Sequence, residues 1–118
     1  MLDKTSWNRI ESETMSAGLR RQMLNGEKIS LGRMRFEPGT KVPWHKHPNE
    51  QITIVTAGTL LMHLDQREIT LGAGEMILVP GDVPHAAVAL DETETIEIFA
   101  PRREDWIAKE DEYLRGPK

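Results

Sequence analysis

The stretch that decides the fold of this chain is GTKVPWHKHPNEQITIVTAG, residues 39–58. Its second half is rich in β-branched residues and ends at a glycine, which predicts a strand. His45 and His47 stand two positions apart at the mouth of this strand, so on an extended backbone both imidazoles point to the same face. Gln51 has the same parity as the histidines whereas Glu50 does not, so we expect the glutamine, and not the glutamate, beside them.

Strand signals recur on both sides of this stretch. Short runs rich in β-branched and aliphatic residues alternate with Pro, Gly and Asp turn signals about every eight to twelve residues, which is typical of antiparallel sandwiches and small barrels. Strands do not alternate with long helical segments, and this disfavours a parallel sheet. The sequence therefore predicts an all-β fold, with strands in residues 29–37, 50–58, 59–74 (two strands around a turn), 75–90 (two strands around a Pro/Gly corner) and 93–102.

Only the end of the chain has a helical pattern. Residues 101–115, PRREDWIAKEDEYLR, begin with proline and carry acidic residues near their start, as helix N-termini prefer. Trp106, Ile107 and Leu114 can form one apolar side. We expect a short C-terminal helix that packs against the barrel; the alternative is a partly frayed tail.

Length, charge and composition restrict the class of protein. A chain of 118 residues without a linker or repeat suits one domain, over residues 1–118. The net charge of −4 argues against a broad nucleic-acid surface, and the lack of cysteine excludes disulfides and thiolate metal sites. The N-terminal segment has no apolar signal region, and no apolar run approaches the ~20 residues of a membrane span. We expect a cytoplasmic protein with no nucleic-acid or membrane partner.

Three histidines are candidates for one metal site. His85 follows a Pro/Gly corner at the start of a later strand, where a barrel can bring it next to His45 and His47. Three imidazoles and the side-chain oxygen of Gln51 are suitable ligands for one divalent transition metal ion, with zinc, nickel, iron and manganese all open. A set of four protein ligands leaves positions for water or substrate, as in catalytic metal sites.

The remaining histidine, His63, is expected outside this site. Apolar residues occupy alternate positions around it and form the core face of their strand, so His63 faces outward. Arg33 and Arg35 also share a strand face, and the sequence leaves open whether that face is inside or outside. The predicted core residues around His63 are Leu60, Met62 and Leu64.

Two motifs of the chain resemble those of the cupin superfamily. The first cupin motif is a glycine, five residues, His-x-His, a few residues, glutamate, six residues and a glycine; residues 39–58 match it, with Gln51 at the glutamate position. Residues 74–89 match the second motif, with Asp82 at a glycine position and Ala89 where cupins have an asparagine. The resemblance implies a jelly-roll barrel, also described as a double-stranded β-helix.

A closer resemblance is to a subgroup of single-domain cupins that convert unsaturated uronates from pectin and alginate into linear keto sugars. Residues 45–51, HKHPNEQ, are similar to its H-x-H-P-x-E-Q motif, and residues 97–105, EIFAPRRED, to its D-x-F-S-P-x-R-E-D motif. Glu97 stands where the subgroup has its catalytic aspartate. The resemblance implies Glu97 as the catalytic acid, Arg103 and Phe99 as substrate-binding residues, and as metal ligands His45, His47, Gln51 and His85.

The residues around Glu97 leave alternatives open. Glu97 and Phe99 share one strand face, and Ile96 and Ile98 share the other, whose apolar character predicts packing. Glu97 then faces a cavity, where an acid can shuttle a proton, or it belongs to an acidic strand exposed to solvent. Arg103 can hold a substrate carboxylate through two parallel hydrogen bonds, or it can pair with nearby acidic residues.

The neutral amide of Gln51 favours one class of chemistry. It leaves a divalent ion its full double positive charge, which suits anionic oxygen ligands and Lewis-acid chemistry better than oxygen activation. Non-redox chemistry on a small acidic substrate is therefore expected. The resemblance to the uronate-linearising cupins implies that the protein is a metal-dependent isomerase that linearises 4,5-unsaturated uronates. The alternatives are a cupin dioxygenase of the quercetinase or diketone type, a polyketide-cyclase-like enzyme, and a module that binds a small ligand without catalysis. A homodimer is also expected, because single-domain cupins commonly pair, with the segment around Trp7 adding an edge strand to the neighbour.

Overall fold

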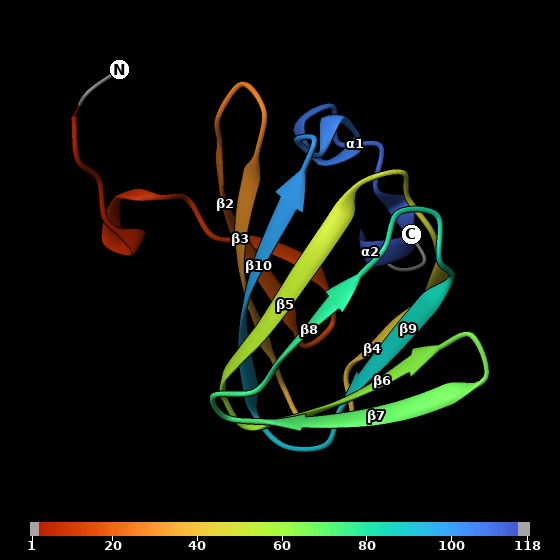
Figure 1. The fold of residues 1–118 in the computed structure, drawn as a ribbon. Coiled ribbons are helices and arrows are strands. Elements are labelled where there is room, and N and C mark those ends of the chain that lie inside the picture. Colours follow the sequence, from red (N-terminus) through yellow and green to blue (C-terminus); the bar gives the residue numbers. More distant parts are fainter. Residues whose placement is uncertain (1–2, 116–118) are drawn as a thin grey trace.

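Two antiparallel β-sheets face each other and enclose the core (Figure 1). A computed structural model describes residues 3–115. Residues 1, 2 and 116–118 of the expected domain 1–118 lie outside the described part. Every strand pairing is antiparallel, and helical segments are confined to single turns, so the all-β prediction is confirmed.

Both sheets pair strands that are distant in the sequence. In the six-stranded sheet the spatial order is β1 (Glu13–Ser16), β2 (Leu19–Asn25), β3 (Ser30–Phe36), β10 (Thr93–Ala100), β5 (Glu50–Ala57) and β8 (Met76–Val79). In the four-stranded sheet it is β4 (Lys41–His45), β9 (His85–Ala89), β6 (Thr59–Leu64) and β7 (Arg67–Gly72). The chain crosses repeatedly between the sheets, as expected for a jelly roll.

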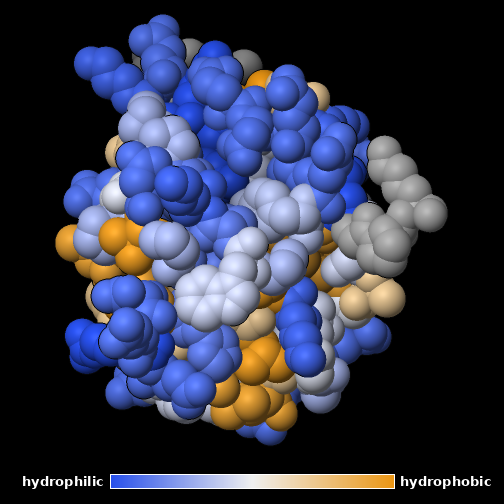
Figure 2. All heavy atoms as spheres, turned by 90° about the vertical axis from the view of Figure 1, so that its right-hand side faces the viewer, coloured by the Kyte–Doolittle hydropathy of each residue, from blue (hydrophilic) through white to orange (hydrophobic). Residues whose placement is uncertain are grey.

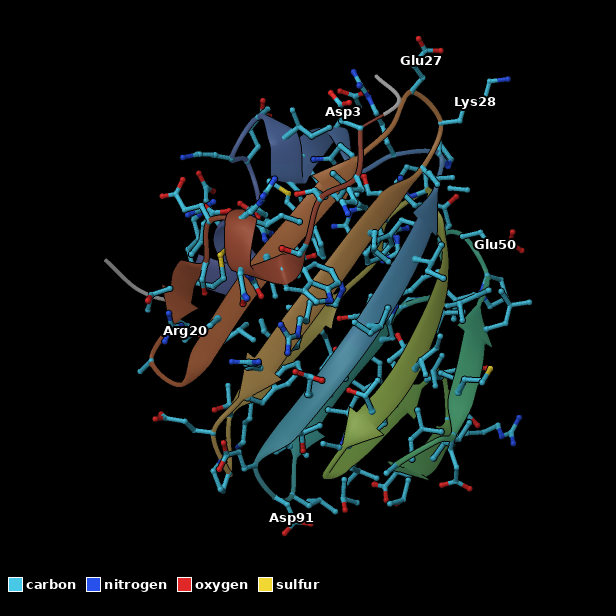
Figure 3. The ribbon with its side chains drawn as sticks, turned by 90° about the vertical axis from the view of Figure 1, so that its left-hand side faces the viewer. Asp3, Arg20, Glu27, Lys28, Glu50 and Asp91 are labelled. Atoms are coloured by element: carbon cyan, nitrogen blue, oxygen red, sulfur yellow. The ribbon has the colours of Figure 1, made fainter. Side chains whose placement is uncertain are left out.

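The outer surfaces of the two sides differ in character. Figure 3 shows the outer face of the six-stranded sheet, where β2, β3, β10 and β5 run side by side. Arg33 and Arg35 lie on this outer face, and both pair with Glu94. Figure 2 shows the opposite side of the molecule, which is largely hydrophilic with a hydrophobic patch in its lower half.

All the segments predicted as strands contain strands, but β1, β2 and β4 are not predicted. The alternation in β2 is hidden because Arg21 faces inward and is fully buried, at a position where an apolar residue is the ordinary choice. β4 contains Pro43, which lacks a backbone donor and is tolerated because β4 is an edge strand.

The core consists of two apolar clusters between the sheets. The predicted core face of β6 is confirmed, since alternate residues of this strand are buried. His63 lies on the outer side of the strand, where its Nδ1 is 3.6 Å from the carboxylate of Glu68. The buried residues of β6 are Leu60, Met62 and Leu64.

The inner face of β10 is unusual because it is mostly polar. Thr95, Glu97 and Phe99 are buried, whereas Ile96 and Ile98 are half-buried on the outer face. The expectation that the isoleucines form the packed face is therefore wrong. Buried polar groups lower stability unless they are hydrogen-bonded. The polar interior therefore indicates that a functional site lies at this part of the barrel.

The C-terminal segment forms two single-turn helices in place of one. These are α1 (Glu104–Ile107) and α2 (Glu112–Arg115), and Lys109 between them has a positive φ of 58°, which an α-helix cannot accommodate. Trp106 and Leu114 are buried as expected, but Ile107 is 37% exposed. No helix among residues 3–115 is long and apolar enough to cross a membrane.

The N-terminal segment is folded onto its own chain. Trp7 lies in the 3-10 turn η1 (Trp7–Arg9), and the Gln22 side-chain amide donates to the carbonyls of Trp7 and Ile10 at 2.7 and 2.9 Å. Trp7 itself therefore lies in a turn, and β1, which follows it, is an edge strand of the six-stranded sheet. That the segment around Trp7 adds an edge strand to a neighbour stays a prediction. The homodimer itself stays a prediction.

The glycine that ends the first motif should be sensitive to substitution. Gly58 has a φ of +84°, and a Cβ there would lie 2.2 Å from the carbonyl oxygen of Glu92, whereas Gly74 has a φ of +88° and open space around it. Gly74→Ala should lower the free energy of unfolding by about 1–2 kcal/mol through the left-handed backbone alone. Gly58→Ala should lower it by about 1–3 kcal/mol more, because the backbone must also move. Urea titrations of the two variants measure the difference, and equal losses would contradict the close approach.

Candidate metal centre

Three imidazoles meet inside one end of the barrel. His45 ends β4 and His85 begins β9, and the two are cross-strand partners. His47 lies in the loop that leads from β4 to β5. The ligand-type nitrogens of the three rings all lie within 4.8 Å of one another. The structure therefore brings together the three histidines that the sequence predicts for the site.

Backbone carbonyls fix how each ring is protonated. The Nδ1 atoms of His45, His47 and His85 lie 2.8, 3.1 and 2.8 Å from carbonyl oxygens two residues away in the chain. A carbonyl only accepts, so each Nδ1 carries the proton and donates it, and each Nε2 keeps a free lone pair. Metal-binding histidines typically have this support on the nitrogen that faces away from the ion. The carbonyls belong to Pro43, Asn49 and Val83.

The free lone pairs on the imidazole Nε2 atoms have no hydrogen-bond donors among the described residues. The Nε2 atom of His85 is buried and has no hydrogen-bond partner there. The Nε2 atom of His47 faces the Oε1 atom of Gln51 at 2.9 Å, and both atoms then present lone pairs. Burial lowers the pKa of His47 to about 4, so a proton does not bridge these atoms at neutral pH.

A metal ion fits this set of atoms. Two ligand atoms that each bind one ion at about 2.1 Å lie roughly 3–3.5 Å apart, close to the separation of His47 Nε2 and Gln51 Oε1. Burial also lowers the pKa of His45 to about 3 and lowers the pKa of His85. Neutral imidazoles are the form that binds metal ions, so the three-histidine cluster suits a divalent transition metal.

The Gln51 amide connects this cluster to Glu97. Its Nε2 atom donates to Thr53 Oγ1 at 2.8 Å and to Glu97 Oε1 at 2.9 Å. With the nitrogen committed to Glu97, the oxygen is the atom that faces His47. A glutamate at this position has no donor and would place a second carboxylate against Glu97. Glutamine is thus the residue that serves both neighbours.

Glu97 is fully enclosed by hydrogen-bonding groups. Thr53 Oγ1 donates to its Oε1 at 3.1 Å, and Thr95 Oγ1 donates to its Oε2 at 3.3 Å. Burial raises the pKa of the Glu97 carboxyl, while these donors and the charge of Arg103 oppose the shift. Of the two interpretations left open by the sequence, Glu97 faces the interior cavity and not solvent.

Two loops clamp the segment that carries His47. The backbone N–H of Asp82 donates to the His47 carbonyl at 2.8 Å. A Cβ at Gly81 would lie 2.4 Å from the Pro48 oxygen, so only glycine permits this approach. Asn49 is buried and donates to the carbonyls at the end of β10, with Nδ2 2.6 Å from the Pro101 oxygen. The sequence analysis did not identify Asn49, because its partner lies about fifty residues away.

Phe99 and Arg103 line the same cavity. Phe99 packs edge-on against His47, with ring centroids 5.7 Å apart. The Arg103 guanidinium is buried between Phe99 and Trp106, 4.7 and 4.5 Å from the ring centroids. It donates through Nε and Nη2 to Asp105 at 2.9 and 2.7 Å. Arg103 therefore pairs with a nearby acid, which is one of its two predicted roles, and its Nη1 has no hydrogen bond to a described residue.

Tyr113 is another residue of the site that the sequence analysis did not identify. Tyr113, on α2, stacks on His45 with ring centroids 4.3 Å apart and an interplanar angle of 23°. Its hydroxyl accepts from Arg103 Nη2 at 2.8 Å. It is the only tyrosine of the chain, and nothing in its sequence neighbourhood indicates contact with the distant His45. Glu50, in contrast, is exposed at the start of β5 and points away from the barrel (Figure 3).

Replacement of His85 should abolish metal binding. His85→Ala removes one of three converging imidazoles, so zinc or cobalt affinity should fall by more than about 100-fold, beyond the loss caused by removal of a supporting residue. His63→Ala is the matched control, because His63 lies outside the barrel, and its affinity should equal that of the wild type. Isothermal titration of metal into the chelator-treated proteins measures both. Equal losses in the two variants would show that this cluster does not hold the ion.

Acidification should destabilise the metal-free protein. The pKa of His45 is lowered from 6.5 to about 3, and that of His47 to about 4. Below pH 6.5 these histidines bind protons in the unfolded state but not yet in the folded state. The free energy of unfolding therefore falls as the pH decreases from 6.5 towards 4. Urea titrations over this range in the presence of a chelator measure the slope, and His45→Ala should reduce it. An unchanged slope would contradict the depressed pKa.

Comparison with known proteins supports the family suggested by the motifs. The cupin domain family matches residues 32–100, which is more than half of the chain. The fold is similar to that of an RmlC-like cupin from Shewanella frigidimarina, with 30% identity, a TM-score of 0.82, and coverage of 86% of this chain and 93% of that one. No curated protein matches the sequence.

More distant structures share the fold alone. KdgF from Halomonas sp. is 24% identical with a TM-score of 0.81, and the match covers 86% of this chain and 96% of that chain. A variant of oxalate decarboxylase from Bacillus subtilis is 18% identical with a TM-score of 0.73, and the match covers 82% of this chain but 29% of that chain. The two facing antiparallel sheets and the matched residues 32–100 lead to one conclusion: this chain belongs to the cupin family.

Proposed function

We propose that the protein is a metal-dependent isomerase that opens the ring of 4,5-unsaturated uronates. The observation that carries the proposal is the hydrogen bond from Gln51 Nε2 to Glu97 Oε1, because it places a buried acid directly beside a residue of the metal cluster. The similarity of residues 97–105 to the uronate-linearising cupins supports this substrate class.

Four side chains would hold the ion. The Nε2 atoms of the three histidines and the Oε1 atom of Gln51 are all neutral, so zinc, nickel, iron or manganese would keep its double positive charge. When bound, the ion would supply Lewis-acid chemistry and attract the carboxylate of an acid sugar. The proposed ligands are His45, His47, Gln51 and His85.

Glu97 would move the proton in this reaction. Burial raises the pKa of its carboxyl, which favours the protonated form that can donate. In the isomerisation the anomeric hydroxyl loses a proton and the C1–O bond of the ring breaks, so that C1 becomes an aldehyde. The double-bond carbon C4 gains a proton, and C5, which keeps the former ring oxygen, becomes a ketone. The atoms balance without a co-reactant, so one acid that gives and takes a proton is sufficient.

Arg103 and Phe99 would position the sugar. The Asp105 carboxylate holds the Arg103 guanidinium in place, and Nη1 remains to donate to an oxygen of the substrate. Phe99 packs against His47 and presents an apolar wall next to it. Loss of the Arg103 contact should mainly raise KM, since it acts on substrate binding.

Substitution of Glu97 should separate proton transfer from metal binding. Glu97→Gln should lower kcat for a 4,5-unsaturated galacturonate by about 10²–10⁴-fold, while zinc still binds. Glu94→Gln is the matched control, since Glu94 lies on the outer face of the same strand and pairs with Arg33, and it should retain activity. The assay follows the loss of the ultraviolet absorbance of the ring double bond.

Three experimental results would contradict the isomerase proposal. No acceleration over the spontaneous reaction by the fully metallated protein would exclude the isomerase. Oxygen uptake with iron or manganese, absent with zinc, would indicate the dioxygenase class instead. Tight binding of galacturonate without turnover would indicate a binding module.

A further inference from the structure

The metal centre lies at a small cavity that the C-terminal segment partly covers. Figure 1 shows α1 and α2 at the end of the barrel where β10 ends and β5 begins. The cavity measures about 40 Å³, and Trp106, Tyr113 and Leu114 of the C-terminal segment form part of its wall. A buried water needs about 10–15 Å³ of such space, so the cavity has room for a few water molecules and is too small to take up a whole six-carbon acid in this conformation. Part of the wall must move before such a ligand can reach the metal.

The backbone on both sides of Tyr113 is anchored. The carboxylate of Asp111 is fully buried and pairs with Arg21, which is also fully buried, and with Arg115 at 2.8 Å. Leu114 is buried in the core, and Glu13 of β1 pairs with Arg21 at 3.2 Å. Breaking a buried ion pair leaves uncompensated charges and is expensive. Movement of α2 as a whole is therefore disfavoured.

Tyr113 itself is the wall residue that can move. Tyr113 is only half-buried, whereas Asp111 and Leu114 are buried. Rotation of one side chain breaks only the stacking on His45 and the hydrogen bonds to its hydroxyl, from Arg103 at 2.8 Å and from Trp106 at 3.5 Å. Such rotations occur far faster than movement of an anchored segment.

We propose that Tyr113 determines which ligands reach the metal centre. Its ring rotates away from His45 to admit a ligand larger than a few atoms. The same rotation removes the Tyr113 hydroxyl from Arg103, so Nη1 and Nη2 both become available on one edge of the guanidinium. A carboxylate matches that edge with two parallel hydrogen bonds, whereas a neutral sugar does not compensate for the lost contact. Opening of the cavity is thereby coupled to recognition of an acid.

This inference depends on the metal centre but not on the uronate reaction, so unreactive probes can test it. The cobalt(II)-loaded protein would be titrated with azide, galacturonate and galactose, with visible absorption as the readout. The variants are Tyr113→Leu, which removes the stacked ring and the hydroxyl, and Tyr113→Phe, which removes the hydroxyl alone. Glu112→Gln is the matched control, because Glu112 is the exposed neighbour on the same helical turn.

The expected result is a change that depends on ligand size and charge. Galacturonate should bind roughly tenfold more tightly to Tyr113→Leu and roughly fivefold more tightly to Tyr113→Phe, because the bond to Arg103 no longer has to break. Azide should bind all four proteins equally, and galactose should remain a weak ligand. Equal changes for azide and galacturonate, weaker galacturonate binding in Tyr113→Phe, or loss of the cobalt spectrum in either variant would overturn the proposal.

Discussion

The hydrogen bonds from three imidazole Nδ1 atoms to backbone carbonyls are the interactions on which the site depends. They fix the orientation of the three rings, so that the Nε2 lone pairs converge. Each carbonyl is two residues from its histidine. The surrounding turns serve this arrangement: the close contact of Gly81 with the Pro48 oxygen and the bond from the Asp82 N–H hold the His47 loop. Residues of the two cupin motifs thus support the same geometry from opposite sides.

Gln51 links the three-histidine cluster to the buried acid Glu97. Its amide has one acceptor and one donor end, and the structure uses the oxygen toward His47 and the nitrogen toward Glu97. The extra methylene of Glu97 relative to aspartate lets its carboxylate reach Gln51, Thr53 and Thr95 together. The glutamine therefore combines a neutral oxygen, which is suited to be a ligand of the proposed ion, with a donor for a buried acid.

Local patterns predicted the parts of the site that lie on short stretches of sequence. The alternation in β6 was sufficient for His63, because it depends on the two-residue period of a strand. The motif spacing was sufficient to select the three clustered histidines, although His47 lies in a loop and not on a strand. Contacts between distant segments were not predictable in this way. Arg21 is inward because Asp111, ninety residues later, neutralises it, and Tyr113 belongs to the site only because the barrel brings α2 onto His45. Ile96 and Ile98 were wrongly expected to form the packed face of β10, because the inner face at this end of the barrel is polar.

The three-histidine cluster at the polar end of the barrel suits a metal ion. The most direct test is a long-range proton–nitrogen NMR spectrum of the nitrogen-15-labelled protein without and with zinc. His45, His47 and His85 should each show a protonated Nδ1, and their Nε2 resonances alone should shift when zinc binds, while His63 stays unchanged. Protonation of these rings on Nε2, or zinc binding that leaves their Nε2 resonances in place, would contradict the account.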